Sequence, residues 1–494
     1  VSAVGTTGTV TITTGGVVTA TAGGNAGILG LTTTGALNIT ANRDVSATEP
    51  GTAAHNAIST TGTQTIVANA DVNSATGVIT DTAGTRTVTI GAGGSVNGDV
   101  AAIDVRNTGA ATITNAGTIG TLVTDVAILV SGGADTTITN QAGGVITGDI
   151  TLGAADDTLT NAGTINAGDL NFGAGVDLFT NQAGGTLTVA GATPILGLET
   201  LNNAGTVTAA TGLTFDGGAT ALNNTGTINL GGAPDLRGGT DSFANTGAGI
   251  LNLTANSSIV GAETITQSGR INLNTFTLTG PAVAFTNTGF IDTSGAAGLA
   301  GFTSFSNAGT LDLAAGTFTV PAAVFTNTGT ILADEGASTI TGQTSFANSG
   351  LLDLQDGATD DVLTIDSNFV GSGASTLAVD FSGTDADLLV IDGAASGSTA
   401  VEAAFVGGGL VNLDGVLVVD STTSTADAFV LGDVTGGSPL VDVSLIQDGA
   451  DFFLVSTPNA SLFDPLRIPV LGLSMWYQSA DEVFANTKLP AITT

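Results

Sequence analysis

Apolar and polar positions follow one another along this chain in a motif that returns at a nearly fixed interval. Each copy places an apolar residue, a small residue, Asn, a small residue and Gly in order, and a second apolar residue closes the motif, as in FTNTGTI at 325–331. The Asn, once replaced by Gln, returns every 20–25 residues, at Asn115, Asn140, Asn161, Asn181, Asn203, Asn224, Asn245, Gln267, Asn287, Asn307, Asn327 and Asn348. This period is too short for a propeller blade of about 40 residues, and the dense Leu of a leucine-rich repeat is absent. We therefore predict an all-β fold, a parallel β-helix (β-solenoid) with coils of about 20–22 residues.

Two columns of apolar residues flank the repeated Asn and predict the interior of the coils. Two positions before it stand Ile113, Ile138, Leu159, Phe179, Leu201, Leu222, Phe243, Ile265, Phe285, Phe305, Phe325 and Phe346. Four positions after it, or six where two turn residues are inserted, stand Ile119, Ile146, Ile165, Leu187, Val207, Ile228, Leu251, Ile271, Ile291, Leu311, Ile331 and Leu352. Because an even insertion keeps a side chain on the same face of a strand, both columns are predicted to point inward.

The Asn-x-Gly step itself predicts a corner between two strands. Asn and Gly tolerate positive φ better than other residues, so we expect positive φ at this corner. Stacked Asn amides can also hydrogen-bond from one coil to the next. The repeated Asn is therefore interpreted as structural.

The strength of the period divides the chain into four regions. Residues 1–110 are predicted to form irregular solenoid coils, because GALNITANRDV (35–45) recurs as GTQTIVANADV (62–72) with wider spacing, and residues 111–352 form the regular coils. Residues 353–456 lose the period and become more acidic, which predicts a non-periodic β module. Residues 457–494 hold the only Trp, Tyr, Met and Lys of the chain, and SADE (479–482) is a capping box that predicts a short helix.

Composition excludes several classes of function. The chain has no Cys, which excludes disulfides and thiol chemistry. A net charge of −35 with seven Lys and Arg residues is incompatible with a nucleic-acid partner. No apolar run approaches the roughly 18 residues of a membrane helix, so we expect no membrane span.

The repeats and the C-terminal module resemble a known family. The coils ITNAGTI, LTNAGTI and FTNTGTI resemble the β-helical repeats of autotransporter passengers. The stretch from DVLTIDSNFVGSG through TLAVDFSGTDADLLVIDG to VSLIQDGADFFLVS resembles the autochaperone region of that family, with Phe452 and Phe453 where Trp or Tyr is usual. WYQSADEVFANT (476–487) is similar to the stretch that leads into the family's outer-membrane barrel, which is absent from these 494 residues. The resemblance covers essentially the whole chain and implies export to the surface of a Gram-negative bacterium.

The sequence contains few His, Lys and Arg residues that could act as catalytic bases. The only His is His55, predicted to lie in a loop, so a His-dependent nucleophile is not expected. Parallel β-helices that cleave acidic polysaccharides use Lys or Arg as base, but Arg43, Arg86, Arg106, Arg237 and Arg270 are scattered in sequence. We therefore predict no catalytic residues and no enzyme activity, and keep a carbohydrate-active β-helix as an alternative.

One acidic pattern stands out in two successive coils. Asp149 and Asp169 are 20 residues apart, and so are Asp157 and Asp177. If they stack in adjacent coils, about 4.8 Å apart, like charges repel unless they are protonated or bridged by a cation. The sequence leaves two interpretations open: solvated turn residues, or a calcium site formed by these four aspartates. No other cofactor is expected.

The function that the sequence favours is structural. We expect an exported, rigid β-solenoid that self-associates by head-to-tail contact, with a monomeric surface adhesin that binds a surface ligand as the main alternative. An apolar cluster in the last region is the candidate assembly surface; it comprises Phe463, Leu466, Ile468, Leu471, Met475, Trp476 and Tyr477.

Overall fold

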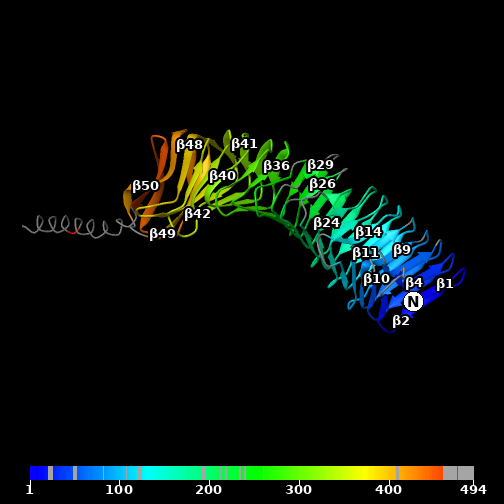
Figure 1. Ribbon diagram of the computed structural model, residues 1–494. Helices are drawn as coiled ribbons and strands as arrows, with labels where there is room; N and C mark the ends of the chain where they lie inside the picture. The colour runs from blue at the N-terminus through cyan, green and yellow to red at the C-terminus, as the bar shows by residue number, and fades with distance from the viewer. Residues whose placement is uncertain are drawn as a thin grey trace, which may run out of the picture. The chain divides into compact units, whose positions relative to one another are not determined.

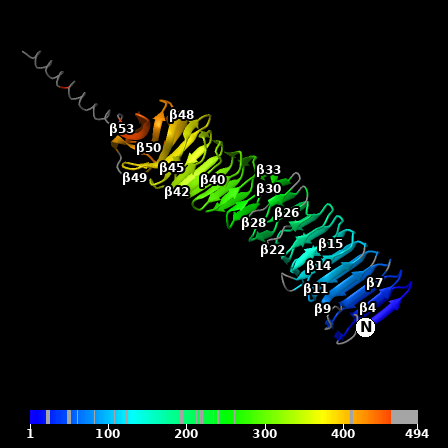
Figure 2. The same ribbon diagram turned by 45° about the horizontal axis from the view of Figure 1, so that its top comes forward.

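The computed structural model is an all-β parallel solenoid, and all 53 of its described elements are strands (Figures 1 and 2). It describes residues 1–459 and Trp476, apart from residues 21–25, 48–52, 60, 82, 107, 121–124, 191–194, 212, 217, 219, 233–234, 238–240, 260 and 408–410. The chain forms two compact units: unit 1 comprises Val1–Ile331 and Ile340–Thr344, and unit 2 comprises Leu332–Thr339 and Ser345–Thr494.

In unit 1 each coil contributes a strand to each of three sides, and the described pairings between coils are parallel. The first side holds β1 (Ser2–Gly5), β4 (Ala26–Thr32), β7 (Ala53–Ser59), β14 (Val126–Val130), β17 (Asp149–Thr151), β20 (Leu170–Asn171), β23 (Ile195–Leu196), β26 (Thr214–Asp216), β29 (Asp235–Arg237), β32 (Ser257–Ser258), β35 (Thr277–Thr279) and β38 (Ala297–Ala300).

The second side holds the strands that carry the repeated Asn and their counterparts in the first coils. They are β2 (Val10–Thr14), β5 (Leu37–Ala41), β8 (Gln64–Ala68), β10 (Arg86–Ile90), β12 (Ala111–Asn115), β15 (Thr136–Asn140), β18 (Thr158–Asn161), β21 (Leu178–Asn181), β24 (Thr200–Asn203), β27 (Ala221–Asn224), β30 (Asp241–Asn245), β33 (Ala262–Gln267), β36 (Ala284–Asn287), β39 (Ser304–Asn307) and β41 (Val324–Asn327).

The third side holds β3 (Val18–Ala20), β6 (Val45–Ala47), β13 (Thr118–Ile119), β16 (Val145–Thr147), β19 (Thr164–Ala167), β22 (Thr186–Val189), β25 (Thr206–Ala209), β28 (Thr227–Leu230), β31 (Ile250–Leu253), β34 (Arg270–Asn274) and β37 (Phe290–Thr293). Three long strands, β9 (Asp71–Asp81), β11 (Ser95–Arg106) and β40 (Thr310–Thr319), continue from the third side into the first side of the next coil. The strands of the third and first sides are thus merged where no turn residue interrupts them.

Both predicted apolar columns lie in the interior. Within unit 1 the column before the Asn stacks residue on residue, as in Ile113, Ile138 and Leu159, and it extends back through Val88, Ile66 and Ile39 to Ile12. Its members are 0–2% exposed except Ile12, which is 6% exposed, and Ile265, which is only half-buried because the register of β33 shifts against β30. Each fully buried apolar side chain stabilises the fold by about 1.5–3 kcal/mol, so this column dominates the core.

The aromatic members of this column pack ring against ring. The ring centroids of Phe285 and Phe305 are 5.8 Å apart, and those of Phe305 and Phe325 are 4.9 Å apart. Offset contacts at such distances add about 0.5–1.5 kcal/mol to the burial of the rings.

The repeated Asn residues form the predicted amide ladder. Asn115 Nδ2 donates to Asn140 Oδ1 at 2.8 Å, and the same bond repeats from coil to coil until Asn245 donates to Gln267 Oε1 at 2.9 Å. Gln267 donates instead to the carbonyl of Gly269, and the ladder resumes from Asn287 to Asn327. Because these amides are almost completely buried, each bond satisfies a group that would otherwise destabilise the interior.

The prediction of positive φ at the corner is confirmed only in the three coils with inserted turn residues, at Gly143, Gly184 and Gly247, and is wrong for the narrow Asn-x-Gly corners. Among the described residues other than Gly, only Asn274 has positive φ, and it does not belong to the ladder. The Gly is required for a different reason: a Cβ on Gly309 would lie 2.1 Å from the carbonyl oxygen of Gly289 in the preceding coil. Stacked backbones approach so closely at this corner that no side chain fits.

Unit 2 keeps parallel coils but ends in an antiparallel hairpin. Its strands are β43 (Ser345–Asn348), β44 (Leu351–Asp353), β45 (Val362–Ile365), β46 (Asn368–Gly371), β47 (Thr376–Ser382), β48 (Leu388–Gly397), β49 (Thr399–Gly407), β50 (Asn412–Ser424), β51 (Phe429–Thr435), β52 (Val441–Asp448) and β53 (Asp451–Pro458), and β42 (Thr330–Thr341) has its middle in this unit. Strand β53 pairs antiparallel with both β50 and β52. The non-periodic β module expected from the sequence therefore folds as coils that are closed by a hairpin.

Candidate functional site

The first predicted acidic pair is stacked in adjacent coils. Asp149 begins β17, Asp169 directly precedes β20, and the main-chain N–H of Asp169 donates to Asp149 Oδ1 at 2.8 Å. Burial raises the pKa of Asp149, and the charges of Asp169 and Asp125 raise it further. The interval of 20 residues thus does bring these two carboxylates together.

The second pair lies in the interior rather than in solvent. Asp157 and Asp177 precede β18 and β21, and each is 1% exposed. Asp157 Oδ1 accepts the N–H of Thr136 at 2.6 Å, and Asp177 Oδ1 accepts the N–H of Asp157 at 2.6 Å. The interpretation as solvated turn residues is therefore wrong for this pair.

Further carboxylates continue the same ladder, and sequence reasoning missed them. Glu199 Oε2 accepts the N–H of Asp177 at 2.7 Å, Asp241 Oδ1 accepts that of Thr220 at 2.5 Å, and Glu263 Oε2 accepts that of Asp241 at 2.5 Å. Together with the buried pair, these make five acids that each stand four positions before a repeated Asn or Gln: Asp157, Asp177, Glu199, Asp241 and Glu263. That fixed offset was the signal that could have identified them.

The ionised form of the buried pair, Asp157 and Asp177, is disfavoured by its surroundings. Burial raises the pKa of Asp157 to about 6, and burial together with the charges of Asp157, Glu199 and Asp156 raises the pKa of Asp177 to about 6. The Oδ2 atom of each is buried and has no hydrogen-bond partner in the described part of the chain. The described residues contain no group of three or more acidic or His side chains arranged to hold a metal ion, and calcium at these four aspartates stays a prediction.

A second polar file runs along the third side of unit 1. Asn252 Nδ2 donates to Asn229 Oδ1 at 2.9 Å, and Asn272 donates to Asn252 in turn. Arg270 joins this file to the next coil, because it donates to Asn272 and forms an ion pair with Asp292. The guanidinium carbon lies 4.3 Å from the ring centroid of Phe290, which is a cation–π contact.

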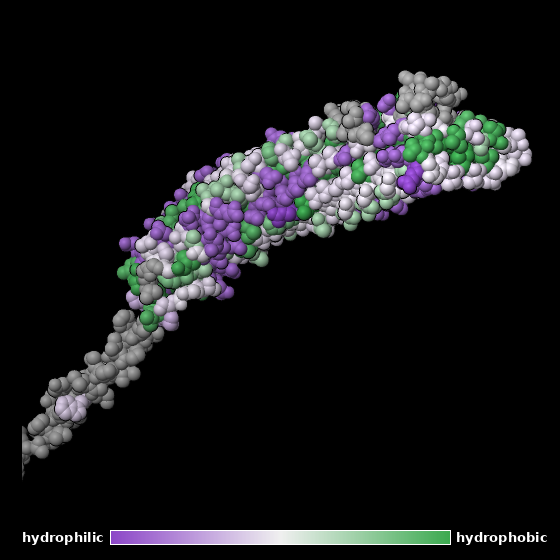
Figure 3. Space-filling view, turned by 60° about the horizontal axis from the view of Figure 1, so that its bottom comes forward, coloured by the Kyte–Doolittle hydropathy of each residue, from purple (hydrophilic) through white to green (hydrophobic). Residues whose placement is uncertain are grey.

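Hydrophilic residues gather in patches on the face seen in Figure 3, among residues of intermediate hydropathy. The half-buried row of Asn, Asp and Arg side chains on the third side offers hydrogen-bond donors and acceptors to a polar ligand.

The other residues considered for catalysis are engaged separately. His55 lies in β7, paired with Ile28 and Val78, and not in the loop that the sequence predicted. Arg86 is 1% exposed and donates to the carbonyl of Arg106, whose own guanidinium pairs with Asp104 at 2.6 Å. The strand pairing of β7 and the hydrogen bond of Arg86 join adjacent coils, whereas the Arg106–Asp104 pair lies within β11.

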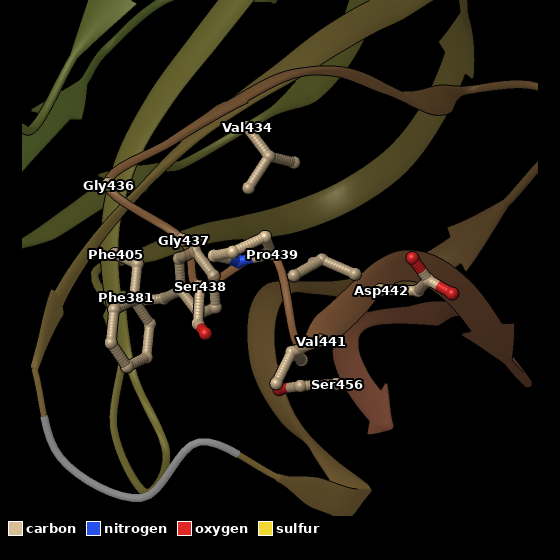
Figure 4. A pocket seen from close by; sticks show the side chains of 11 residues that line it. Phe381, Phe405, Val434, Gly436, Gly437, Ser438, Pro439, Val441, Asp442 and Ser456 are labelled. Carbon is tan, nitrogen blue, oxygen red and sulfur yellow. The ribbon is translucent and has the colours of Figure 1, made fainter. Parts of the chain in front are cut away.

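Unit 2 contains an apolar pocket of about 420 Å³ (Figure 4). The rings of Phe381 and Phe405 meet edge to face at one end, with centroids 5.4 Å apart, and the Asp442 carboxylate lies at the other end. The lining residues are Phe381, Phe405, Val434, Gly436, Gly437, Ser438, Pro439, Val441, Asp442, Val443 and Ser456. The pocket can receive an apolar side chain or a small apolar ligand.

Exposed apolar side chains lie on the same hairpin region of unit 2. Leu413 is 68% exposed, Ile446 is 47% exposed and Leu440 is 46% exposed. Leu413 and Ile446 line a shallow hollow together with Phe453 and Val455. An apolar surface on so acidic a chain is suited to a contact with another molecule.

The predicted assembly residues are almost all outside the described residues. Trp476 is described and is 65% exposed, whereas Phe463, Leu466, Ile468, Leu471, Met475 and Tyr477 are not described. The helix predicted at 479–487 also lies outside the described residues. In the part of the chain that is described, no helix has the length and apolar character needed to cross a membrane.

Comparison with known proteins finds a weak structural likeness. No family model and no curated protein matches the sequence. Among solved structures, the crystal structure of the Haemophilus influenzae Hap adhesin matches with 13% sequence identity and a TM-score of 0.26. The match covers 87% of this chain and 62% of that chain, so this chain spans less than two thirds of that structure. A likeness at this level gives no information on activity or partners.

Proposed function

We propose that this chain is a passenger-like β-solenoid, exported to the surface of a Gram-negative bacterium or beyond it, which acts by presenting surface rather than by catalysis. The resemblance of its coils and C-terminal module to autotransporter passengers supports export. The absence of Cys and the net charge of −35 suit an extracellular, well-solvated protein.

One observation carries this proposal: the interior of unit 1 is occupied along its sides by apolar columns and a buried amide ladder. Such an interior holds the coils in register but provides no place for a substrate. A ligand would therefore contact the outer faces, where rows of polar side chains repeat from coil to coil.

We further propose that copies of the chain associate head to tail into a filament, with the segment from residue 457 onward taking part. The exposed Leu413, Leu440 and Ile446 support a contact surface on unit 2. A heterologous contact of this kind extends into an open filament when it does not close into a ring.

The main alternative is a monomeric surface adhesin. The half-buried Asn file and Arg270 favour it, because regularly spaced donors and acceptors suit a polar surface ligand such as a glycan. A carbohydrate-active β-helix enzyme is the third candidate, and it would need an acid and a base gathered in one groove.

Electron microscopy and light scattering of purified protein test the filament directly. We expect the full chain to form filaments at high concentration in salt and calcium, and a variant that ends at Asn459, which retains all of β53, to remain monomeric. An Ile446→Ser variant of the full chain should associate more weakly, whereas Val324→Ser, on an exposed site of unit 1, should not. A full chain that stays monomeric throughout but binds a glycan surface would instead establish the adhesin.

A further inference from the structure

Three aspartates of unit 2 are buried against one another's backbone. Asp361 precedes β45, Asp380 lies in β47 and Asp387 precedes β48; they are 2%, 2% and 0% exposed. Asp387 Oδ2 accepts the N–H of Asp380 at 2.6 Å, and its Oδ1 accepts the N–H of Asp361 at 3.2 Å. The three residues therefore form one connected cluster.

The outer members of the cluster hold neighbouring turns. Asp361 Oδ1 accepts the N–H of Gly336 at 2.5 Å. Asp380 Oδ2 accepts the N–H groups of Gly357 and Asp356 at 2.6 and 2.9 Å. Each carboxylate thus pins a backbone segment from another part of the unit.

One carboxylate oxygen of the cluster accepts no hydrogen bond from the described residues. Asp361 Oδ2 is buried and has no hydrogen-bond partner among the described residues. A buried carboxylate oxygen without a donor disfavours the ionised form strongly, since neither water nor protein compensates the charge.

No basic side chain lies near these acids in the stretch of the unit that the structure describes up to Asn459. From Leu332 to Asn459 the sequence contains no Lys, Arg or His. The titratable groups that act on the cluster are all acidic: Asp334 on β42, Asp353 on β44, and Asp356 and Asp360 in the turn before β45. The surrounding elements also carry further acids: Glu335 on β42, Asp366 after β45, Asp385 in the turn before β48, Asp392 on β48, Glu402 on β49, and Asp414 and Asp420 on β50.

We propose that Asp361 and Asp387, which are joined through the hydrogen bonds of the cluster, form a proton-binding pair that couples the packing of β45, β47 and β48 to pH. In mildly acidic surroundings the cluster holds protons and the turns that it pins are closed. At alkaline pH the cluster must carry uncompensated negative charge inside the unit, and the strands around it open more often.

The sign follows from the direction of the shifts. Burial and the charges of Asp361 and Asp380 raise the pKa of Asp387 to about 7, and burial raises the pKa of Asp361. A raised pKa in the folded state means that the contribution to stability is complete below the ordinary Asp pKa of about 4 and is lost as pH rises through about 7. Stability of this region should therefore fall between about pH 4 and pH 7 and change little above that range.

Hydrogen–deuterium exchange of the full chain tests the proposal. We expect amides in peptides that cover 361–397 to be roughly tenfold or more better protected at pH 5 than at pH 8.5, after correction for intrinsic exchange, because one pKa unit corresponds to a factor of ten. Peptides that cover 284–307 in unit 1 serve as the internal reference.

Two variants separate the cluster from general charge effects. Asp361→Asn keeps the acceptor for Gly336, places an N–H₂ group at the unpartnered position, cannot ionise and removes one of the charges that raise the pKa of Asp387, so it should lose part of the pH dependence and be better protected at pH 8.5. Asp427→Asn, at an exposed acid of the same unit, should keep the full dependence.

Three results would overturn the proposal. The first is equal protection of 361–397 in the wild-type chain at both pH values, which needs no variant to fold. The second is an Asp361→Asn chain that retains the wild-type dependence. The third is saturable protection by Ca²⁺ at pH 8.5 with EDTA reversal, which would make the cluster a cation site instead.

Discussion

The regular coils of unit 1 and the C-terminal unit use the same parallel strands but satisfy their buried polar groups differently. In unit 1 a single solution, the Asn amide, is repeated in successive coils at 2.8–2.9 Å. In unit 2 Asn348 donates to Ser375 Oγ at 2.8 Å, and Ser375 in turn bonds the Thr399 hydroxyl at 2.8 Å. When the sequence period is lost, each coil requires its own partners.

The two units also differ in how their buried acidic residues are distributed. The acid ladder of unit 1 is interrupted by Thr220, and Arg270 reaches an acid of the same unit, Asp292. The three buried acids of unit 2, Asp361, Asp380 and Asp387, are gathered in one cluster, and the sequence has no Lys, Arg or His between Leu332 and Asn459. Repetition therefore spreads unfavourable charge along the solenoid, whereas the non-periodic unit concentrates it.

Removal of a core ring should have the largest effect and should be similar in both units. Phe325→Ala in unit 1 and Phe369→Ala in unit 2 each remove a buried ring packed against other rings, at an expected loss of about 3–5 kcal/mol in the free energy of unfolding. Calorimetry or urea denaturation measures this loss. The exposed Val324→Ala is the control, and an equal loss there would contradict the inward assignment of Phe325.

Filling a glycine corner should affect the regular coils next most strongly. Gly309→Ala places a Cβ against the backbone of the preceding coil, and such overpacking costs about 1–3 kcal/mol. Gly133→Ala, where a Cβ meets no atom within 4 Å, should change stability by less than about 0.5 kcal/mol. Equal melting temperatures for the two variants would show that the corner can open to admit a methyl group.

Breaking the amide ladder should cost less than removing a ring. Asn161→Ala removes the bonds to Asn140, Asn181 and the carbonyl of Thr186, for an expected loss of about 1–2 kcal/mol. Asn202→Ala, which removes one half-buried bond from Asn223, is the matched control and should cost less. The ladder would be dispensable if denaturation curves of the two variants coincided.

The acidic pair should give the smallest effect, and only at a pH where it is ionised. Because the pKa values of Asp157 and Asp177 are raised to about 6, calcium should raise the melting temperature by a few degrees at pH 8 and not at pH 5. EDTA should reverse the shift, and the double variant Asp157→Asn, Asp177→Asn should abolish it. Asp99→Asn, at an exposed acid of unit 1, should respond like the wild-type chain, and a wild-type curve unchanged by calcium would remove the calcium prediction.

The parts of the fold that repeat could be predicted from the sequence, since a period reports which residues stack. The column from Ile113 to Phe325 and the ladder from Asn115 follow from spacing alone. The half-buried Ile265 could not be predicted, because a register shift between β30 and β33 leaves no mark in the motif.

The candidate sites were less predictable. The stacking of Asp157 on Asp177 followed from their interval, but their burial did not, because the same residue type serves solvated turns. Asp361, Asp380 and Asp387 lie at irregular intervals in non-periodic coils, so the sequence gives no sign that they are close in space. The antiparallel pairing of β53 depends on a single hairpin rather than on a repeat and left no periodic signal.

The lack of Lys and Arg between Arg270 and Arg467 has a consequence for protease sensitivity. Trypsin cuts only after Lys and Arg, and the sequence has neither between Arg270 and Arg467. The last coils of unit 1 and the whole described part of unit 2 therefore offer trypsin no cleavable bond, whether they are folded or unfolded. Enzymes that cut after aromatic residues, at Phe381, Phe405 or Phe453, are the ones that can report when this stretch opens.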